Sequence, residues 1–354
     1  MVIKVVMRSI QSKERKHDMI SLAVKYRPKS FSDVVEQDNI KIILQQQISS
    51  GEIKNAYLFC GPAGDGKTTC ARIFAKEINR GCGNPIEMDA ASNSGVDDVK
   101  AICKQAQTKS LDSEYKVFIV DECHSISNTG WQAFLKLIEE PPAKSIFIFC
   151  TTDPQKIPKT ILSRVQRYDF KMISKKGIVD RLRYVCDKEA IDMVGSIDNN
   201  ALEYVAKIAD GHMRDALTLL DKCLAYSPEI TLENVIKCLG ALDYEEMFAF
   251  TDYIFKLNLK KALDTVENIY NSGRDIKLFL KQYIQFLLDI CKLQIGCDWS
   301  YTSIPAIEEY NIMVGELDDC RDILSAMINV NSNIKYSDSP KYDIEAALFE
   351  FMRD

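Results

Sequence analysis

The sequence has no apolar run that approaches the ~18 residues needed to cross a bilayer. It also lacks a signal-peptide core, because the apolar segment 1–7 is short and is followed directly by the charged segment 12–18. This patterning argues against a membrane protein and against a secreted protein. It predicts a cytoplasmic location.

Disulfide and metal-binding patterns are missing as well. The chain has 12 cysteines but no C-x-x-C pair, and His17 and His212 have no partners at metal-ligand spacing. Several cysteines lie inside apolar periodic segments, where a small buried thiol packs well. These are Cys60, Cys70, Cys150 and Cys223. We therefore expect reduced thiols, as in an intracellular protein.

Size and composition are those of a globular protein. With 354 residues, 46% of them hydrophobic and 27% charged, the chain can form two or three domains with a sizeable core. The formal net charge of −6 opposes nucleic-acid binding overall. Any contact with nucleic acid therefore requires a local basic face.

Strand-like and helix-like segments alternate between residues 56 and 170, which predicts an α/β fold with a parallel sheet and crossover helices. Segments 117–120 and 146–150 are continuously apolar, as strands buried on both faces require. Strands are predicted at 56–60, 86–89, 117–120, 146–150 and 168–170.

Strand signals cease after residue 174, and helical periodicity continues almost throughout the remainder. One long helix is expected at 305–330. The predicted parts are a leader at 1–20, an α/β domain at 21–170, a small helical domain at 171–240 and an all-helical C-terminal domain at 241–354.

A glycine-rich run follows the first predicted strand and opens a helix. It has the phosphate-loop pattern G-x-x-x-x-G-K-[ST], in which the glycines let successive backbone N–H groups point at phosphate oxygens. Lys67 is expected to reach the β- and γ-phosphates, and the Thr68 hydroxyl to ligate Mg²⁺. Asp65 does not suit a phosphate site, because its carboxylate would repel a bound triphosphate unless the side chain points to solvent. The predicted nucleotide-binding residues are Gly61, Pro62, Ala63, Gly64, Asp65, Gly66, Lys67, Thr68 and Thr69.

Two acidic residues, Asp121 and Glu122, end the third predicted strand. Beside a phosphate loop, Asp121 is expected to hold the Mg²⁺ shell and Glu122 to orient and polarise the attacking water. Taken alone, the pair fits a solvated turn equally well. Residues 121–124 also spell the box of one helicase superfamily, but the Ser-Ala-Thr and Gln-x-x-Gly-Arg-x-Gly-Arg elements of such motors are absent. His124 is therefore expected to be structural.

Seven motifs occur in sequence order between residues 24 and 164. They are Val24-Lys25-Tyr26-Arg27-Pro28, the phosphate loop, Met88-Asp89-Ala90-Ala91-Ser92, Asp121-Glu122-Cys123-His124, Leu137-Ile138-Glu139-Glu140-Pro141-Pro142, Thr151-Thr152-Asp153-Pro154-Gln155-Lys156 and Ile161-Leu162-Ser163-Arg164. Together they resemble a bacterial-type clamp-loader AAA+ ATPase, similar to the gamma/tau subunits of DNA polymerase III.

The resemblance implies a P-loop AAA+ domain, a helical lid at 171–240 and an all-α collar or oligomerisation domain at 241–354. It implies ATP and Mg²⁺ as cofactors, and an ATPase of a polymerase holoenzyme that opens a sliding clamp and loads it on DNA in replication. The implied partners are other clamp-loader subunits in a pentameric ring, the sliding clamp and primer-template DNA. No membrane partner is implied.

The resemblance also assigns roles to matching residues. Thr151 or Thr152 matches sensor 1, which reads the γ-phosphate. Arg164 matches the arginine finger that reaches a neighbouring subunit's site, and Arg214 matches sensor 2 on the lid. Each arginine would offset charge on the transferred phosphoryl group, although an isolated arginine fits a surface salt bridge too. The resemblance extends the nucleotide-binding residues to Tyr26, Arg27, Pro28, Val34 and Val35.

The chain departs from the family pattern in two places. Family members commonly carry a four-cysteine zinc module before the second strand, whereas Cys82 is the single cysteine between Asn79 and Ile86, so no zinc is predicted. Val165 replaces the cysteine of the usual Ser-Arg-Cys run, which leaves Arg164 intact. Two alternatives stay open: a scaffold subunit that binds nucleotide with little turnover, and another AAA+ DNA-remodelling ATPase.

Overall fold

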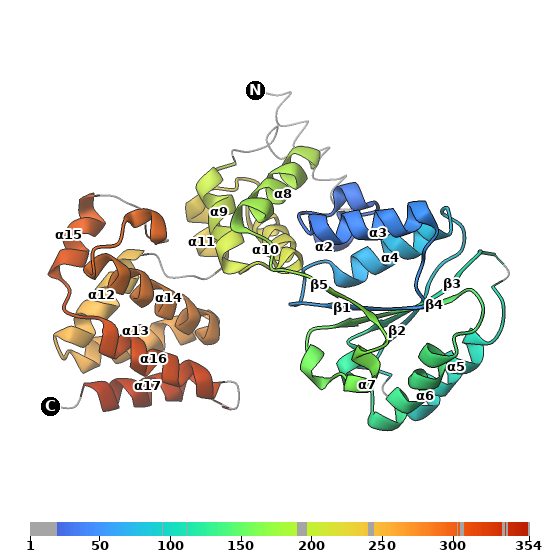
Figure 1. The fold of residues 1–354 in the computed structure, drawn as a ribbon. Helices are drawn as coiled ribbons and strands as arrows, with labels where there is room; N and C mark the ends of the chain where they lie inside the picture. The colour runs from blue at the N-terminus through green and yellow to red at the C-terminus, as the bar shows by residue number, and fades with distance from the viewer. Residues whose placement is uncertain are drawn as a thin grey trace. The chain divides into compact units, whose positions relative to one another are not determined.

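A computed structural model describes residues 20–93, 95–110, 112–189, 197–239, 244–302, 304, 308–334, 337 and 339–352. The predicted leader at 1–20 lies outside the described residues except for its last one. The chain divides into two compact units, Met1–Leu232 and Glu233–Asp354 (Figure 1). No helix in the described ranges is long and apolar enough to span a membrane.

The first unit is built on a five-stranded sheet in the order β2-β3-β4-β1-β5, and each pair of neighbouring strands is parallel (Figure 1). The parallel sheet expected from the strand–helix alternation is therefore confirmed. The strands are β1 (Ala56–Cys60), β2 (Ile86–Asp89), β3 (Lys116–Asp121), β4 (Ser145–Thr151) and β5 (Gln166–Asp169).

Helices cover both faces of this sheet. Alternate side chains of β1 point to opposite faces of the sheet. Tyr57 and Phe59 belong to the core cluster that contains Phe74 of α4. Leu58 belongs to the cluster on the other face, which contains Phe134 of α6. This double burial explains why the central strands are continuously apolar. The helices are α3 (Asp38–Ser50) and α4 (Lys67–Ile78) on one face, and α5 (Val96–Ala106) and α6 (Asn128–Glu139) on the other (Figure 1).

Short elements connect these layers and position functional segments. They are α2 (Leu22–Lys25), η1 (Phe31–Asp33), η2 (Cys123–Ser125), η3 (Pro154–Lys156) and α7 (Lys159–Leu162). The four cysteines expected to pack in apolar segments, Cys60, Cys70, Cys150 and Cys223, are all buried. Burial raises the pKa of the Cys70 thiol to about 12, which keeps it protonated at neutral pH.

Three further helices follow the sheet in the described part of the first unit, and α10 packs against α2, α8 and α9. They are α8 (Lys175–Lys188), α9 (Asn199–Ile208) and α10 (Met213–Tyr226), and α11 (Leu232–Leu239) follows at the border between the units. Ser174 caps α8 by accepting a hydrogen bond from the backbone N–H of Gly177. The chain therefore enters α8 in a fixed direction, immediately after the end of the sheet.

The second unit is helical throughout the residues described. Its core surrounds α14, where the buried Tyr283 hydroxyl lies 2.9 Å from the Thr251 hydroxyl of α12. The elements are α12 (Tyr244–Phe255), α13 (Leu259–Asn271), α14 (Ile276–Gln294), η5 (Trp299–Tyr301), α15 (Glu308–Glu316), α16 (Arg321–Asn333) and α17 (Pro340–Phe351).

The single helix expected at 305–330 is wrong, because α15 ends at Glu316 and α16 begins at Arg321. Hydrogen bonds made by the side chains of Gln294 and Asp319 stabilise the non-helical segment between the two helices. The Gln294 amide donates to the main-chain carbonyls of Leu317 and Asp318 at 3.3 and 2.8 Å. The Asp319 carboxylate accepts from the backbone N–H of Arg321 at 3.1 Å. The Asp319 bond is local and competes with the helical ladder, whereas the Gln294 bonds come from α14. Helical periodicity alone reveals neither.

Candidate nucleotide site

A cavity of about 320 Å³ opens where β1 and β3 end. Its volume falls in the ~300–1,000 Å³ range of small-molecule sites, and crevices at the carboxyl ends of parallel strands are the usual ligand sites of such sheets. The lining residues are Ala23, Tyr26, Arg27, Pro28, Val34, Val35, Ala63, Gly64, Asp65, Gly66, Lys67, Thr68, Thr69, Arg72, Asp121, Glu122, Ile173, Arg181, Met213, Arg214 and Leu217.

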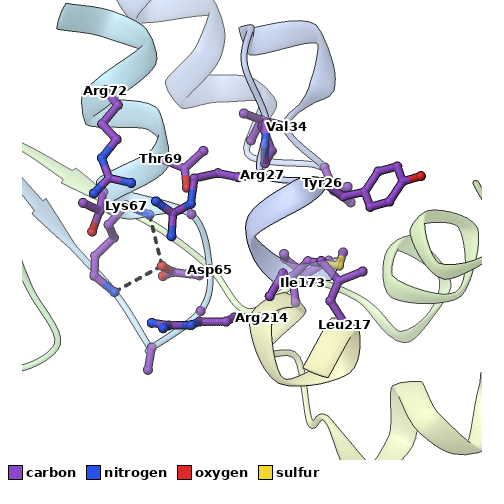
Figure 2. A pocket seen from close by; sticks show the side chains of 18 of the residues that line it. Tyr26, Arg27, Val34, Asp65, Lys67, Thr69, Arg72, Ile173, Arg214 and Leu217 are labelled. Atoms are coloured by element: carbon purple, nitrogen blue, oxygen red, sulfur yellow. Dashed lines mark hydrogen bonds and ion pairs between the residues drawn. The ribbon is translucent and has the colours of Figure 1, made fainter. Parts of the chain in front are cut away.

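Most of the residues predicted for the site line this cavity together, although they come from segments as far apart as Tyr26 and Arg214. Figure 2 shows the side chains of Arg27, Lys67 and Arg214 directed toward the same region. The predicted residues that do not line it are Gly61, Pro62, Thr151, Thr152 and Arg164.

The phosphate loop follows β1, and its last two residues, Lys67 and Thr68, are the first two residues of helix α4. Gly61, Gly64 and Gly66 have φ angles of 153, 75 and 99°, a region that residues with a Cβ rarely adopt. Gly66 is the N-cap of α4 and Lys67 its first residue. The N–H groups of the first helical turn, which have no acceptor within the helix, therefore lie beside the cavity, where they favour an anion.

Asp65 belongs to this loop and does not point to solvent, since only 1% of it is exposed. Its Oδ1 lies 3.1 Å from the Lys67 ammonium nitrogen (Figure 2). Burial raises the pKa of the Asp65 carboxyl, and the nearby Lys67 ammonium opposes that rise. The solvent-facing orientation that would have accommodated a triphosphate is therefore not found.

Thr68 and Asp121 form the second contact of the site. The Thr68 hydroxyl donates to Asp121 Oδ2 at 2.7 Å, so the two predicted Mg²⁺ ligands are adjacent although they are 53 positions apart. A hydroxyl and a carboxylate are hard oxygen donors, and Mg²⁺ is commonly held by one or two such groups together with substrate phosphates and water. This donor set fits Mg²⁺.

Glu122 has an unusual backbone. Its φ of 45° places a residue with a Cβ in the left-handed region, a strain that is concentrated at functional sites. The Glu122 carboxylate accepts a hydrogen bond from the Thr152 hydroxyl at 3.1 Å and lies 3.2 Å from His124 Nδ1. The same His124 nitrogen lies 3.2 Å from the Thr151 hydroxyl. Thr152, which follows β4, and His124, which follows β3, thus contact the Glu122 carboxylate.

The segment around Tyr26 is anchored to α8 and forms another wall of the cavity. The Tyr26 hydroxyl donates to Glu189 at 2.5 Å, and Arg181 donates to the Tyr26 carbonyl at 2.8 Å. Burial, with the hydrogen bond to Glu189, raises the pKa of the Tyr26 hydroxyl. Arg181 also lies over the Tyr184 ring, 4.9 Å from its centroid. Sequence reasoning missed Arg181 because no motif contains it.

The start of α10 contacts the phosphate loop directly. His212, the residue before α10, lies with Nδ1 2.5 Å from the carbonyl oxygen of Ala63. A Cβ at Gly64 would lie 3.3 Å from the Cβ of His212, so glycine permits this close approach. Sequence reasoning assigned His212 no role, although its place two residues before Arg214 was a usable signal.

Arg164 lies away from the cavity. It forms an ion pair with Glu139 at 2.9 Å and donates to the Thr160 carbonyl at 2.8 Å, and its side chain is 40% exposed. Cys82 is exposed in the connection between α4 and β2. Within the described ranges, no group of three or more His, Cys, Asp or Glu residues is placed to hold a metal ion.

Three family profiles match successive parts of the chain. They are described as DNA polymerase III, delta subunit (residues 84–174), DNA polymerase III clamp loader subunit, ATPase lid domain (177–229), and DNA polymerase III subunits gamma and tau domain III (230–313). The matches follow one another without overlap. Together they cover the sheet after the phosphate loop, the helices α8 to α10 and much of the second unit.

Individual relatives agree with these profiles. The chain is 37% identical over 287 residues to DNA polymerase III subunit tau of Bacillus subtilis, a match that covers 75% of this chain and 50% of that protein. It is 31% identical over 357 residues to DNA polymerase III subunit gamma of Buchnera aphidicola, covering 92% of this chain and 97% of that protein. The chain thus spans about half the length of the Bacillus relative and almost all of the Buchnera one.

Among solved structures, the Thermotoga maritima RuvB Holliday junction branch migration motor has a similar fold. The TM-score is 0.52 at 20% identity, and the match covers 71% of this chain and 86% of that one. This likeness supports the AAA+ architecture of a parallel sheet with a helical lid. The profiles and the relatives go further: the chain belongs to the clamp-loader gamma/tau subunit family of DNA polymerase III, within the AAA+ ATPases.

Proposed function

We propose that the chain binds ATP with Mg²⁺ in this cavity and hydrolyses it in the cytoplasm. We further propose that, in a pentameric ring with other clamp-loader subunits, it uses this cycle to open a sliding clamp and load it on primer-template DNA. The observation that carries the proposal is the convergence of Lys67, the Thr68–Asp121 pair and Glu122 on one cavity. Family membership supports it.

Binding is assigned to groups that suit a charged nucleotide. Five basic side chains line the cavity, against the acidic Asp65, Asp121 and Glu122, so the lining favours an anion. The N–H groups at the start of α4 and the Lys67 ammonium would hold phosphate oxygens. The apolar lining residues Val34, Val35, Ile173 and Leu217 would pack against the base.

Hydrolysis requires positioning and charge stabilisation more than covalent chemistry. Mg²⁺ held by Thr68 and Asp121 would neutralise charge on the phosphate oxygens. Glu122 would hold the attacking water in line with the γ-phosphorus and polarise it. Thr152 and His124, which contact the Glu122 carboxylate, would fix its direction. Arg214 would add positive charge from α10.

Arg164 is proposed to act in a neighbouring subunit. It lies outside its own cavity and half-exposed, as a finger acting in trans requires. A finger of this kind supplies charge only after assembly, so that hydrolysis would depend on the ring being formed. Primer-template DNA and the clamp would promote hydrolysis by favouring that assembled state.

The test compares wild type, Glu122→Gln and Glu114→Gln in steady-state ATP hydrolysis, with and without partner subunits, clamp and primer-template DNA. Glu114→Gln is a charge-matched control. Glu114 lies just before β3, at the end of the strand away from the cavity, where it is exposed and paired with Lys144. We expect Glu122→Gln to keep ATP binding and to lose about 10²-fold or more of the turnover. Glu114→Gln should behave as wild type.

Other outcomes identify the alternatives. Wild-type ATP binding with negligible turnover, even with clamp and DNA present, would indicate a scaffold subunit. Turnover that responds to DNA but not to the clamp would indicate another DNA-remodelling ATPase. Equal turnover in wild type and Glu122→Gln would refute the catalytic assignment of Glu122.

A further inference from the structure

The Lys67 ammonium is fully engaged by the protein itself. It donates to the carbonyl oxygens of Gly61 and Pro62 at 2.8 and 2.5 Å and to Asp65 Oδ1 at 3.1 Å, and it is 6% exposed. An ammonium group has three N–H donors and no more. A phosphate oxygen can therefore bind Lys67 only if one of these three acceptors is released.

Asp65 is the charged member of this set. Its Oδ1 also accepts from the Lys67 backbone N–H at 3.4 Å, while its buried Oδ2 has no hydrogen-bond partner in the part of the chain that the structure describes. A buried carboxylate is costly unless it is paired, and Lys67 is the cation that pairs it. Asp65 thus depends on the same ammonium that the phosphates need.

The carboxylate also lies close to the expected position of the phosphates. It is one residue before Gly66, the N-cap of α4, and it lines the same cavity as Lys67 and Thr68. A triphosphate bound at the start of α4 would face this negative charge. Two like charges at short range in a water-poor site repel each other more strongly than they would in solvent.

We propose that Asp65 is an internal competitor for the phosphate loop: its carboxylate occupies the place on the Lys67 ammonium that a nucleotide phosphate oxygen takes, and so lowers affinity for nucleoside triphosphate. The inference rests on the proposed nucleotide site. Asp65 is then a specificity-determining residue, because the cost of displacing it falls most heavily on the ligand with the most negative charge near Lys67. A diphosphate, without the γ-phosphate, meets less of this repulsion.

The test measures binding of the nonhydrolysable triphosphate AMP-PNP and of ADP, each with Mg²⁺, by calorimetry on the full chain. Asp65→Asn keeps the size and one acceptor oxygen but removes the charge, and Asp65→Ser removes the competing group altogether. Glu114→Gln changes the net charge equally at a distant, exposed position. Thermal unfolding with and without AMP-PNP provides a second readout.

We expect Asp65→Asn to bind AMP-PNP about 10- to 100-fold more tightly than wild type, and ADP less than about 10-fold more tightly. Asp65→Ser should likewise gain more affinity for AMP-PNP than for ADP, and Glu114→Gln should bind both nucleotides as wild type does. Without nucleotide the Tm of Asp65→Asn should fall, because the buried Lys67 ammonium loses the negative charge of Asp65 that balances it. The increase in Tm on adding AMP-PNP should be larger than in wild type.

Unchanged or weaker AMP-PNP binding in folded Asp65→Asn or Asp65→Ser, while wild type binds, would overturn the inference and leave the nucleotide site standing. An equal gain for AMP-PNP and ADP would overturn the selectivity for triphosphate. No binding of either nucleotide by wild type or any variant would instead refute the proposed site, and the inference with it.

Discussion

Replacing Gly61 with alanine tests how tightly the phosphate loop is built into the sheet. Gly61 has a φ of +153°, and a Cβ there would lie 2.3 Å from the Asp65 Oδ2, 2.6 Å from the Phe170 carbonyl oxygen and 2.9 Å from the Phe170 Cβ. Phe170 cannot easily move away, because its backbone N–H donates to the Cys60 carbonyl at 2.7 Å. The added methyl group therefore meets the Phe170 backbone as well as the buried Asp65 carboxylate.

Two contributions set the expected loss of stability. A residue with a Cβ in a glycine-only backbone region costs about 1–3 kcal/mol, and overpacking costs a further ~1–3 kcal/mol, so that unfolding should become easier by about 2–6 kcal/mol. Gly51 is the matched control, since its φ is +73° but a Cβ there has nothing within 4 Å. Gly51→Ala should cost only the backbone contribution, about 1–2 kcal/mol.

The assay is urea unfolding followed by tryptophan fluorescence. The sequence has two tryptophans, and in a Trp299→Phe background the buried Trp131 of α6 reports the first unit alone. Gly61→Ala should lower the free energy of unfolding by at least ~1 kcal/mol more than Gly51→Ala, and should weaken AMP-PNP binding as the loop shifts. Equal losses in the two variants would refute the close packing derived for Gly61.

Three further predictions concern the chemistry. Lys67→Ala should weaken ATP binding about 100-fold or more, because the loop loses its cation while Asp65 stays buried; calorimetry giving wild-type affinity would contradict the nucleotide assignment. Arg164→Ala should leave ATP affinity of the isolated chain unchanged but reduce clamp- and DNA-stimulated hydrolysis by at least ~10-fold, less than the ~10³–10⁵ of other arginine fingers. Mixing it with Lys67→Ala chains should restore some activity if both join one ring, whereas equal losses in isolated and assembled chains would place Arg164 within its own subunit. Cys82→Ser should leave folding unaltered and metal analysis should find no zinc, since one cysteine cannot form a tetrahedral site; stoichiometric zinc in the wild-type protein would overturn this.

The positions of β1, β3 and β4 were predictable because a strand buried on both faces must be apolar over its whole length. The expected 56–60 agrees with β1, and the expected 117–120 and 146–150 lie within β3 and β4. The expected 86–89 agrees with β2, although only Met88 of this edge strand is buried. The break between α15 and α16 was not predictable, because it depends on Gln294, which belongs to α14 and is brought there by helix packing.

The sequence by itself determined which groups meet at the edge of the sheet. A phosphate loop after one parallel strand and two acids after another must come together, because the carboxyl ends of parallel strands share an edge. The contact between Thr68 and Asp121 follows from that rule.

Only the tertiary structure decided which way individual side chains point. Asp65 was expected to be tolerable only in solvent, yet it is buried against Lys67, an orientation that no local pattern encodes. The contacts of His212 with Ala63 and of Arg164 with Glu139 join segments distant in the chain. They depend on helix packing, of α10 against α2, α8 and α9 and of α7 against α6. Hydrophobic periodicity fixes which face of an element is buried, but packing decides which polar groups then become neighbours.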